Sequence, residues 1–517
     1  MSQVIIMATI IVYLVAVVII GVVCSKKNNA VDDFYLGGRK LGPFVTAMSA
    51  EASDMSSWLL MGLPGLAYLT GVADAAWTAI GLAIGTYVNW LIVAKRIRKY
   101  TQGYDTFTIP DFFSKRFGDD KRILTFIAAV IIVIFFIPYT ASGFAACGKL
   151  FSSLFGFNYL AAMIISAVII VAYCTLGGFL AASMTDLIQS IVMTIALIVV
   201  VLFGINVAGG VDAVIDNSKA LPGYLGLFDT YSAATNSAQP YSFLKIVSML
   251  AWGLGYCGMP HILVRFMAVR DEKELAKSKK VAIVWVLISL VLACVIGVLG
   301  RAYLYPMVLS NEGAQYENVY IEMIKKLFMT DYTLPFIGGL LLCGILAAIM
   351  STADSQLLVS SSAVANDLFK GVFFKKLKDK QVLFIARATV FVVAIIAIVI
   401  AWNPNSSIMN LVSDAWAGLG SAFGPLVVMS LWKRMNLAGA AAGMASGGLT
   451  VIIWDYIKCC TLDGVHVTPA TYTGVYSLLV GFIVSLVFIV VVSLATPKAS
   501  DEIMQEFEDV KNGNINA

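Results

Sequence analysis

Polar residues interrupt an apolar stretch of the chain between Ser49 and Gly65. Two carboxylates, Glu51 and Asp54, stand there among several hydroxyls, and the stretch ends on Pro64 and Gly65. Ser and Asp side chains compete with a helix for backbone hydrogen bonds, so the sequence predicts that the helix unwinds here. In a membrane, an unwound turn exposes carbonyl oxygens that bind sodium. A re-entrant or merely kinked structural segment is the alternative, but it leaves the central carboxylate unexplained.

A second set of oxygen ligands is spaced along one predicted helical face. Four small residues occupy positions i, i+3, i+4 and i+7 of that face: Ala348, Ser351, Thr352 and Ser355. Hydroxyl and carbonyl oxygens are the hard ligands that a small cation prefers. Small polar residues also mediate ordinary helix packing in membranes, so the spacing favours ion binding and packing equally.

Aromatic residues recur near the middle of the chain. Trp252, Tyr256 and Pro260 are four residues apart and stand beside glycines, which predicts one aromatic helical face. Such a face fits a small, partly apolar zwitterion with a ring or an aliphatic side chain. The alternative is an interfacial aromatic belt with core packing. His261, next to this stretch, is predicted to be a structural hydrogen-bonding group rather than a proton carrier.

The composition indicates that these residues lie within a membrane protein. Of 517 residues, 60% are hydrophobic and 13% charged, against about a quarter charged in soluble proteins. This composition, together with a mean hydropathy of +0.87, excludes a soluble enzyme, a disordered protein and a nucleic-acid binder. The eight cysteines and two histidines form no metal or redox motif. There is no phosphate-binding loop either, so an ion gradient must drive any active transport.

Thirteen apolar runs are long enough to cross a bilayer, which needs about 20 residues. They lie at roughly 4–24, 42–70, 73–94, 123–148, 159–177, 187–208, 242–264, 281–302, 334–366, 382–402, 408–432, 437–457 and 472–495. The first run lacks the features of a cleaved signal peptide and is predicted to be a retained span. Most of the 35 Lys and Arg residues fall on one side, which predicts an outside N-terminus and an inside C-terminus.

Several of these segments together resemble the sodium/solute symporter family. The matching stretches are 34–39, 53–65, 251–256, 260–263 and 347–352. The resemblance implies an all-α polytopic protein with a LeuT-type core of two inverted five-helix repeats, at about 42–208 and 242–432. A single transmembrane transporter domain then covers residues 1–497, and the tail 498–517 is predicted to be cytoplasmic and disordered.

The resemblance also implies which residues bind sodium and solute. Backbone carbonyls of Ala52, Met55 and Ala348 and hydroxyls of Ser351 and Thr352 would form the sodium site. Asp54 matches the carboxylate that the family associates with sodium dependence. The positions that match solute binding and its gate are Ser56, Trp58, Tyr139, Trp252, Tyr256 and Pro260.

Three positions depart from the family pattern. Glu51 stands where a small residue is usual, Ser57 replaces a glycine, and Asp354 replaces a small hydroxyl residue. Asp354 suggests a second cation site with Asp186, a family acid, and with Ser355, because two carboxylates in a poorly solvated place need a cation or a proton between them. The alternative is that Asp354 pairs with a basic residue at the cytoplasmic rim.

The resemblance implies a function as a multi-pass symporter of the bacterial cell (plasma) membrane. It would import L-proline or a similar small solute with sodium as the coupling ion, by alternating access. Its environment would be the lipid bilayer, with no nucleic acid and no obligate protein partner. Two alternatives are a sodium symporter for another solute, such as pantothenate or another carboxylate, and a transporter-like solute sensor. An enzyme is not predicted, because no nucleophile, base and oxyanion set can be assembled.

Overall fold

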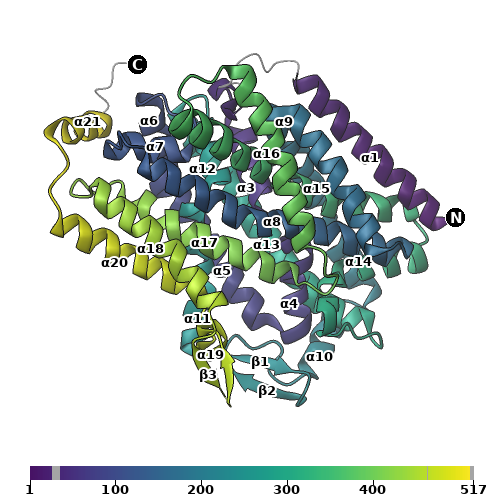
Figure 1. Cartoon of the computed structure of the whole chain (residues 1–517). Helices are drawn as coiled ribbons and strands as arrows, with labels where there is room; N and C mark the ends of the chain where they lie inside the picture. Colours follow the sequence, from purple (N-terminus) through teal and green to yellow (C-terminus); the bar gives the residue numbers. More distant parts are fainter. Residues whose placement is uncertain (26–34, 463, 513–517) are drawn as a thin grey trace.

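The structure is a computed structural model that describes residues 1–25, 35–462 and 464–512. Long helices cross the molecule side by side, since a backbone inside a bilayer must satisfy its hydrogen bonds internally (Figure 1). The unbroken long helices are α1 (Ser2–Ser25), α8 (Ile123–Phe155), α13 (Leu275–Leu304), α16 (Asp379–Ile400), α17 (Ile408–Met429), α18 (Leu437–Tyr456) and α20 (Ser477–Ala495).

Other long helices are bent or broken. The broken helices are α3 (Pro43–Asp54) with η2 (Trp58–Gly62) and α4 (Leu63–Thr70), α5 (Val72–Val88) with η3 (Asn89–Val93) and α6 (Ala94–Gly103), α11 (Phe243–Leu250) with η4 (Ala251–Gly258) and α12 (Pro260–Met267), and α15 (Pro335–Ser362) with η8 (Ala363–Phe373). Helix α9 (Tyr159–Val207) is kinked at Gly178, whose φ of 64° is accessible to glycine without strain.

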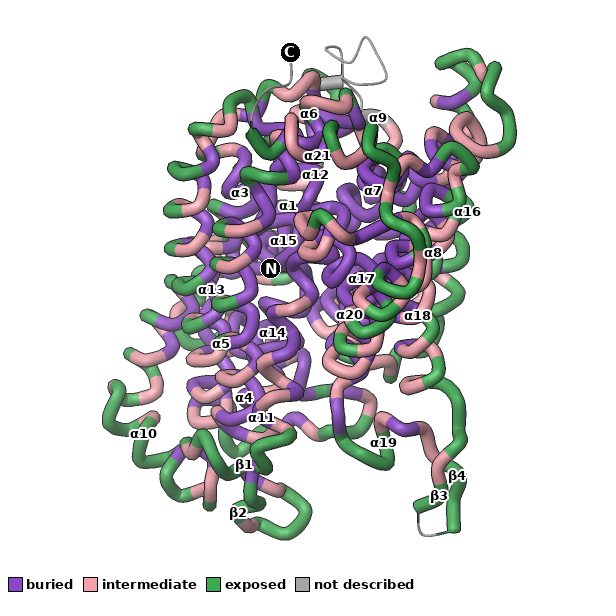
Figure 2. Tube along the Cα trace, turned by 90° about the vertical axis from the view of Figure 1, so that its left-hand side faces the viewer, coloured by how far each residue is buried: buried purple, intermediate pink, exposed green. Residues whose placement is uncertain are grey.

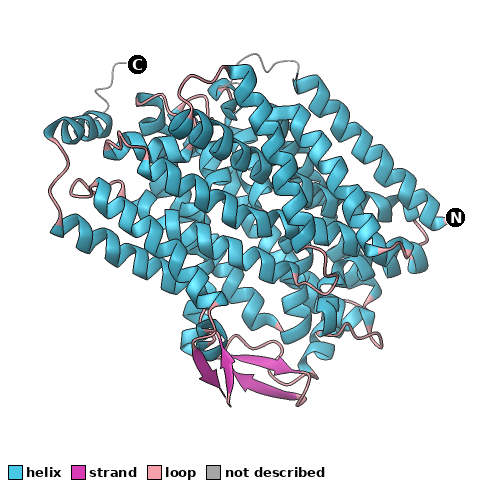
Figure 3. Ribbon diagram, in the orientation of Figure 1, coloured by secondary structure: helices cyan, strands magenta, loops and turns pink. Residues whose placement is uncertain are grey.

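Short elements join the long helices at both ends. They are η1 (Gly37–Arg39), α7 (Ile109–Phe117), α10 (Val211–Lys219), η5 (Glu272–Glu274), η6 (Glu312–Asn318), α14 (Val319–Ile324), η7 (Lys325–Asp331), α19 (Pro469–Thr473) and α21 (Asp501–Asn512). Two antiparallel hairpins pair β1 (Asp229–Ser232) with β2 (Ser237–Pro240), and β3 (Cys460–Leu462) with β4 (Val465–Val467). Both hairpins lie at one end of the molecule, which we call the hairpin end, and α21 lies at the other (Figures 2 and 3).

The predicted polytopic helical architecture is confirmed. Among the described residues, ten helices are long and apolar enough to cross a membrane, and the pair Phe243–Gly258 and Pro260–Met267, bent by 45°, is an eleventh candidate. Two shorter apolar helices, Trp58–Thr70 and Tyr159–Thr175, occupy two further predicted ranges. The count of thirteen and the orientation of the termini stay predictions.

The C-terminal tail differs from the predicted disorder. Residues 501–512 form α21, and 513–517 lie outside the described residues. Although α21 is rich in acidic residues, it carries two buried apolar side chains, Phe507 and Val510, three residues apart on one helical face. The Phe507 ring lies 4.4 Å from the Arg116 guanidinium, and Glu508 pairs with Lys433 at 2.9 Å. These contacts dock α21 on α7 and on the segment after α17.

Removal of the Phe507 side chain should release α21 from this surface. Truncation of a buried phenylalanine costs ~3 kcal/mol. We therefore expect Phe507→Ala to speed amide hydrogen exchange in residues 501–512 about a hundredfold, as measured by mass spectrometry. Glu502→Ala, on the exposed side of the same helix, is the control and should leave exchange unchanged. Equal protection in both variants would show that Phe507 does not hold the helix.

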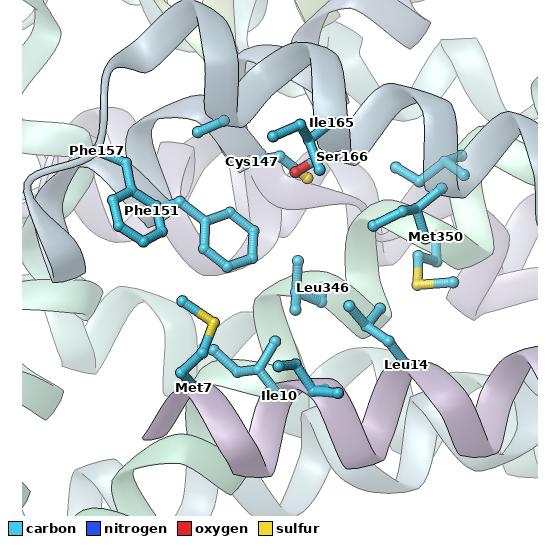
Figure 4. A pocket seen from close by; sticks show the side chains of 14 residues that line it. Met7, Ile10, Leu14, Cys147, Phe151, Phe157, Ile165, Ser166, Leu346 and Met350 are labelled. Atoms are coloured by element: carbon cyan, nitrogen blue, oxygen red, sulfur yellow. The ribbon is translucent and has the colours of Figure 1, made fainter. Parts of the chain in front are cut away.

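An apolar cavity of about 230 Å³ lies between α1, α8, α9 and α15. Figure 4 shows Met7, Ile10 and Leu14 of α1 facing Phe151 and Cys147 across it. Of the described side chains that line this cavity, only Ser166 carries an oxygen, so the cavity offers no set of hard side-chain ligands for a cation.

Candidate ion and solute site

The helix unwinds between α3 and η2, as the sequence predicts. Met55 has a φ of −78° and a ψ of 79°, and residues 55 and 56 are not helical. The π-helical turn η2 follows, just before Pro64, which cannot donate a backbone hydrogen bond. The unwound turn is fully buried, since Asp54, Met55 and Ser56 are all inaccessible. It therefore places backbone carbonyls in the interior of the helix bundle.

Helix α15 faces this turn with its hydroxyl residues. The Ser351 hydroxyl donates to the Ala52 carbonyl at 2.8 Å and lies 3.2 Å from the Ala348 carbonyl. The buried Thr352 hydroxyl has no hydrogen-bond partner among the described residues. Three predicted ligands, Ala52, Ala348 and Ser351, are thus in contact. Thr352 follows Ser351 on α15, and Met55 lies in the unwound turn itself. A buried, unsatisfied hydroxyl one residue from the Ser351–Ala52 contact fits a sodium site.

Asp54 is the point where the predicted solute residues converge. The Tyr256 hydroxyl donates to Asp54 Oδ2 at 2.5 Å. The Asp54 backbone carbonyl accepts from the Tyr139 hydroxyl and from Trp58 Nε1, both at 3.0 Å. Asp54 Oδ1 has no partner among the described residues. Ser56 is buried next to this group, and its Oγ accepts from the backbone nitrogen of Trp58 at 3.5 Å.

The predicted single face of Trp252, Tyr256 and Pro260 is wrong. Residues 251–258 form a 3₁₀ helix, η4, which has three residues per turn, so a spacing of four rotates each side chain by about 120°. Met259 is extended and separates Pro260 from the other two. Trp252 consequently lines a cavity of about 280 Å³ at the hairpin end, and Pro260 lines another of about 20 Å³ beside Arg265.

Close packing holds this 3₁₀ segment directly against two neighbouring helices. A Cβ on Gly253 would lie 2.0 Å from the Gly81 carbonyl oxygen of α5. A Cβ on Gly255 would lie 2.0 Å from Nε1 of Trp416. Both glycines let η4 contact its neighbours directly, and this contact is tertiary, so no local pattern in the sequence reveals it.

Trp416 on α17 is a site residue that the sequence reasoning missed. Its Nε1 donates to the Trp252 carbonyl at 2.7 Å, and its ring stands edge-on to Tyr256 at 5.2 Å. The position of α17 is fixed at its N-terminus by Glu317, which accepts from the backbone nitrogens of Ile408 and Met409 at 3.0 and 3.1 Å. A lone tryptophan within an apolar run gave no signal in the sequence.

Glu51, one of the departures from the family pattern, has a specific partner. Trp90 Nε1 donates to its Oε1 at 2.7 Å, while Oε2 has no partner among the described residues. Ser57, another departure, is buried, and its hydroxyl also lacks a partner in the described part of the chain. Neither side chain contacts Ser351 or Thr352 by a hydrogen bond in the described residues.

The predicted second cation site contains a guanidinium group. Arg265, buried on α12, pairs with Asp186 at 3.2 Å and donates to the Ser355 hydroxyl at 2.5 Å. Asp186 also accepts from Ser49 at 2.6 Å. Ser355 lies 3.1 Å from Asp354, whose Oδ2 has no partner among the described residues. A basic residue is thus present, but its direct partner is Asp186 rather than Asp354.

His261 lies in the same region and differs from its predicted role. Neither ring nitrogen has a hydrogen-bond partner among the described residues. Its ring stands edge-on to Phe136 at 5.4 Å and to Tyr139 at 6.1 Å. The histidine is therefore an aromatic packing residue, and its backbone carbonyl accepts from Arg265 at 2.7 Å.

The chain is similar in sequence to two known proline transporters. The chain is 42% identical over 489 residues to the osmoregulated proline transporter OpuE of Bacillus subtilis (strain 168), covering 94% of each protein. It is 41% identical over 508 residues to the sodium/proline symporter of Staphylococcus aureus (strain JH9), covering 97% of this chain and 94% of the relative.

Solved structures share the fold at low sequence identity. A Na⁺-coupled sialic acid symporter in a substrate-bound outward-open state superposes with a TM-score of 0.75 at 17% identity, covering 96% of this chain and 99% of the other. The transporter Mhp1 in a closed conformation gives 0.54 at 14% identity, covering 92% and 98%. The LeuT-type architecture is therefore confirmed. A family model described as the sodium:solute symporter family matches residues 34–447, so the chain belongs to this family of transporters, not to an enzyme family.

Proposed function

We propose that this protein imports L-proline with sodium across the bacterial cell membrane by alternating access. The observation that carries the proposal is the meeting of Asp54, Tyr139 and Tyr256 next to the Ser351–Ala52 contact. It puts a carboxylate, aromatic rings and hard oxygens around one buried turn. The proline and sodium named for the two relatives support the choice of solute and ion.

Sodium binding would use this chain's oxygens as follows. The carbonyls of Ala52, Met55 and Ala348 and the hydroxyls of Ser351 and Thr352 replace the water around the ion. Asp54 balances the positive charge from the neighbouring position. Because the ligands come from both the unwound turn and α15, ion binding would hold these two elements together. Loss of the ion would free them to separate.

Solute binding would use the aromatic group around Asp54. Trp58, Tyr139 and Tyr256 supply an apolar wall for a pyrrolidine ring, and Ser56 offers a hydroxyl. Trp252 and Pro260 line separate cavities on the two sides of this group. We therefore assign them to the access routes of the solute, as gate residues rather than as contacts in one pocket.

A variant at Tyr256 separates its ring from its hydroxyl. Tyr256→Ala should raise the proline concentration for half-maximal uptake about tenfold, because an aromatic contact and a hydrogen bond to a charged group are lost. Tyr256→Phe keeps the ring and should alter the sodium requirement more than the proline requirement, since only the bond to Asp54 is lost. Uptake of labelled proline at varied proline and sodium concentrations measures both. Unchanged proline dependence in Tyr256→Ala would remove Tyr256 from the solute site.

The second predicted cation site would hold no transported ion. We propose that Arg265 is the resident cation between Asp186, Ser355 and Asp354, so that one sodium ion accompanies each proline. The buried guanidinium pairs with Asp186 and donates to Ser355, so it already occupies the position between these groups that a sodium ion would take. We further propose that the protein acts in the lipid bilayer without an obligate protein partner.

Transport in proteoliposomes tests the proposed function against its alternatives. Purified protein should accumulate labelled L-proline with an inward sodium gradient and not with an equal potassium gradient. Unlabelled pantothenate at the same excess should leave proline uptake unchanged, whereas unlabelled proline should abolish it. Sodium-driven uptake of pantothenate instead of proline would favour the other-solute alternative. Solute binding without any uptake would favour a sensor.

A further inference from the structure

The cavity at the hairpin end that Trp252 lines is separate from the buried site at Asp54. Its volume is about 280 Å³, and residues of α17, α18, α19 and η4 contribute to its wall. Asn410 and Gly474, both exposed, lie at its rim, so solvent reaches it. Neither the proposed sodium site nor the proposed solute site uses its polar residues.

Two carboxylates face this cavity. Asp414 on α17 accepts from the Tyr456 hydroxyl at 2.6 Å, and Asp455 lies on the neighbouring helix α18. Asp455 Oδ2 is buried without a hydrogen-bond partner in the described residues. Within that same part of the chain, no basic side chain forms a salt bridge with either carboxylate. Two half-buried carboxylates without a salt-bridge partner favour the binding of a cation.

An independent polar group points to a ligand on the inner wall. Thr78 on α5 lines the cavity and is completely buried, with 0% of its surface exposed. Its hydroxyl has no hydrogen-bond partner among the described residues. A buried hydroxyl is rarely left unsatisfied unless water or a ligand reaches it. The cavity is the space from which either would reach Thr78.

Aromatic rings form the wall between this cavity and the buried site. The Trp252 ring stacks on Tyr476 with centroids 4.9 Å apart, and the Tyr476 hydroxyl donates to the Ser413 carbonyl at 2.8 Å. Trp252 in turn lies 6.3 Å from Trp416, which contacts Tyr256 beside Asp54. A chain of aromatic contacts through Trp252 and Trp416 therefore links the cavity to Tyr256 and the group around Asp54.

We propose that this cavity binds the ammonium group of the incoming amino or imino acid, through Asp414 and Asp455, before the solute reaches Asp54. The two carboxylates attract the positive group, and the aromatic side chains of Trp252 and Tyr476 in the same wall add cation–π attraction. A cation that carries a carbon ring fits this cavity better than a bare sodium ion, because apolar side chains such as Leu66, Met249 and Trp252 line it together with the polar ones. The inference rests on the proposed function, since it gives that solute its first binding step.

Pyrrolidine is the probe that tests the site. At neutral pH it is a ring with an ammonium group and no carboxylate, so it should occupy the cavity without completing transport. Calorimetric titration of the purified wild type should detect pyrrolidine binding, and this binding should be lost in Asp414→Asn/Asp455→Asn. Tetrahydrofuran-2-carboxylate, which has the ring and the carboxylate but no ammonium, should not bind. Asp212→Asn, an exposed acid on α10 at the same end, is the matched control and should bind normally.

Uptake supplies the second readout. The double variant should need about tenfold more proline for half-maximal uptake, which corresponds to ~1.4 kcal/mol, with its sodium requirement unchanged. Unchanged pyrrolidine binding in the double variant would overturn the proposal, as would a shift in the sodium requirement instead of the proline requirement. If the double variant does not fold, Asp455→Asn alone keeps the Tyr456–Asp414 bond and should still weaken pyrrolidine binding. A wild type that binds pyrrolidine but transports no proline would refute the proposed function, while the binding of an ammonium group in this cavity would still stand.

Discussion

Asp54→Asn is expected to raise the sodium concentration for half-maximal proline uptake more than tenfold. The carboxylate is fully buried, with one oxygen held by Tyr256 and the other without a partner among the described residues. A charge at this depth is stabilised by a cation beside it, and its neutral amide analogue loses that attraction. The loss of an interaction with a charged group costs ~1.5–3 kcal/mol, enough for the predicted change.

The matched control is Glu51→Gln, three residues earlier on the same buried helix. Its Oε1 accepts from Trp90, and a glutamine oxygen can accept the same bond. We expect its sodium requirement to stay within about twofold of the wild type, because small changes in one neutral hydrogen bond cost under ~1 kcal/mol. Equal sodium requirements in wild type and well-expressed Asp54→Asn would exclude this carboxylate from ion binding.

Arg265→Met is expected to cause the largest loss of stability. It leaves Asp186 as a buried charge without its partner, and the removal of one member of a buried ion pair costs ~3–5 kcal/mol. Methionine has a similar length and no charge, so packing changes little. Thermal unfolding of the purified protein should show a clear drop in the transition temperature. The double variant Arg265→Met/Asp186→Asn should recover most of it, because both charges are then absent.

Sodium provides a second test of Arg265. If the guanidinium occupies a place that a sodium ion could take, added sodium should stabilise Arg265→Met more than it stabilises the wild type. The double variant lacks the acid and should lose this extra effect. No difference in stability between Arg265→Met and the wild type would contradict the assignment of Arg265 as the resident cation.

The sequence is a good guide to features that local chemistry decides. The unwound turn was predictable because Ser53, Asp54 and Pro64 each weaken a helix through their own side chains. The polar face of α15 was predictable because Ser351 and Ser355 are one helical turn apart, with Thr352 beside them. Both features depend on residues that are close along the chain.

Features that depend on distant contacts were not predictable. The 3₁₀ helix η4 packs where Gly253 meets α5 and Gly255 meets Trp416, contacts between segments far apart in the chain. Arg265 counts among the basic residues of the predicted inner side, but its burial against Asp186 brings together residues 79 positions apart. The acidic tail predicted disorder, whereas one buried ring, Phe507, docks it as a helix.

The sodium-to-proline ratio tests the central claim most directly. In proteoliposomes with set sodium and proline gradients, the voltage at which proline-dependent current reverses gives this ratio, since each transported charge contributes ~2.3 kcal/mol per 100 mV. Coupling through the single site at Asp54, Ser351 and Thr352, with Arg265 in place of a second ion, predicts one sodium per proline. A reversal voltage independent of the sodium gradient would contradict sodium coupling, and a ratio of two would contradict the role assigned to Arg265.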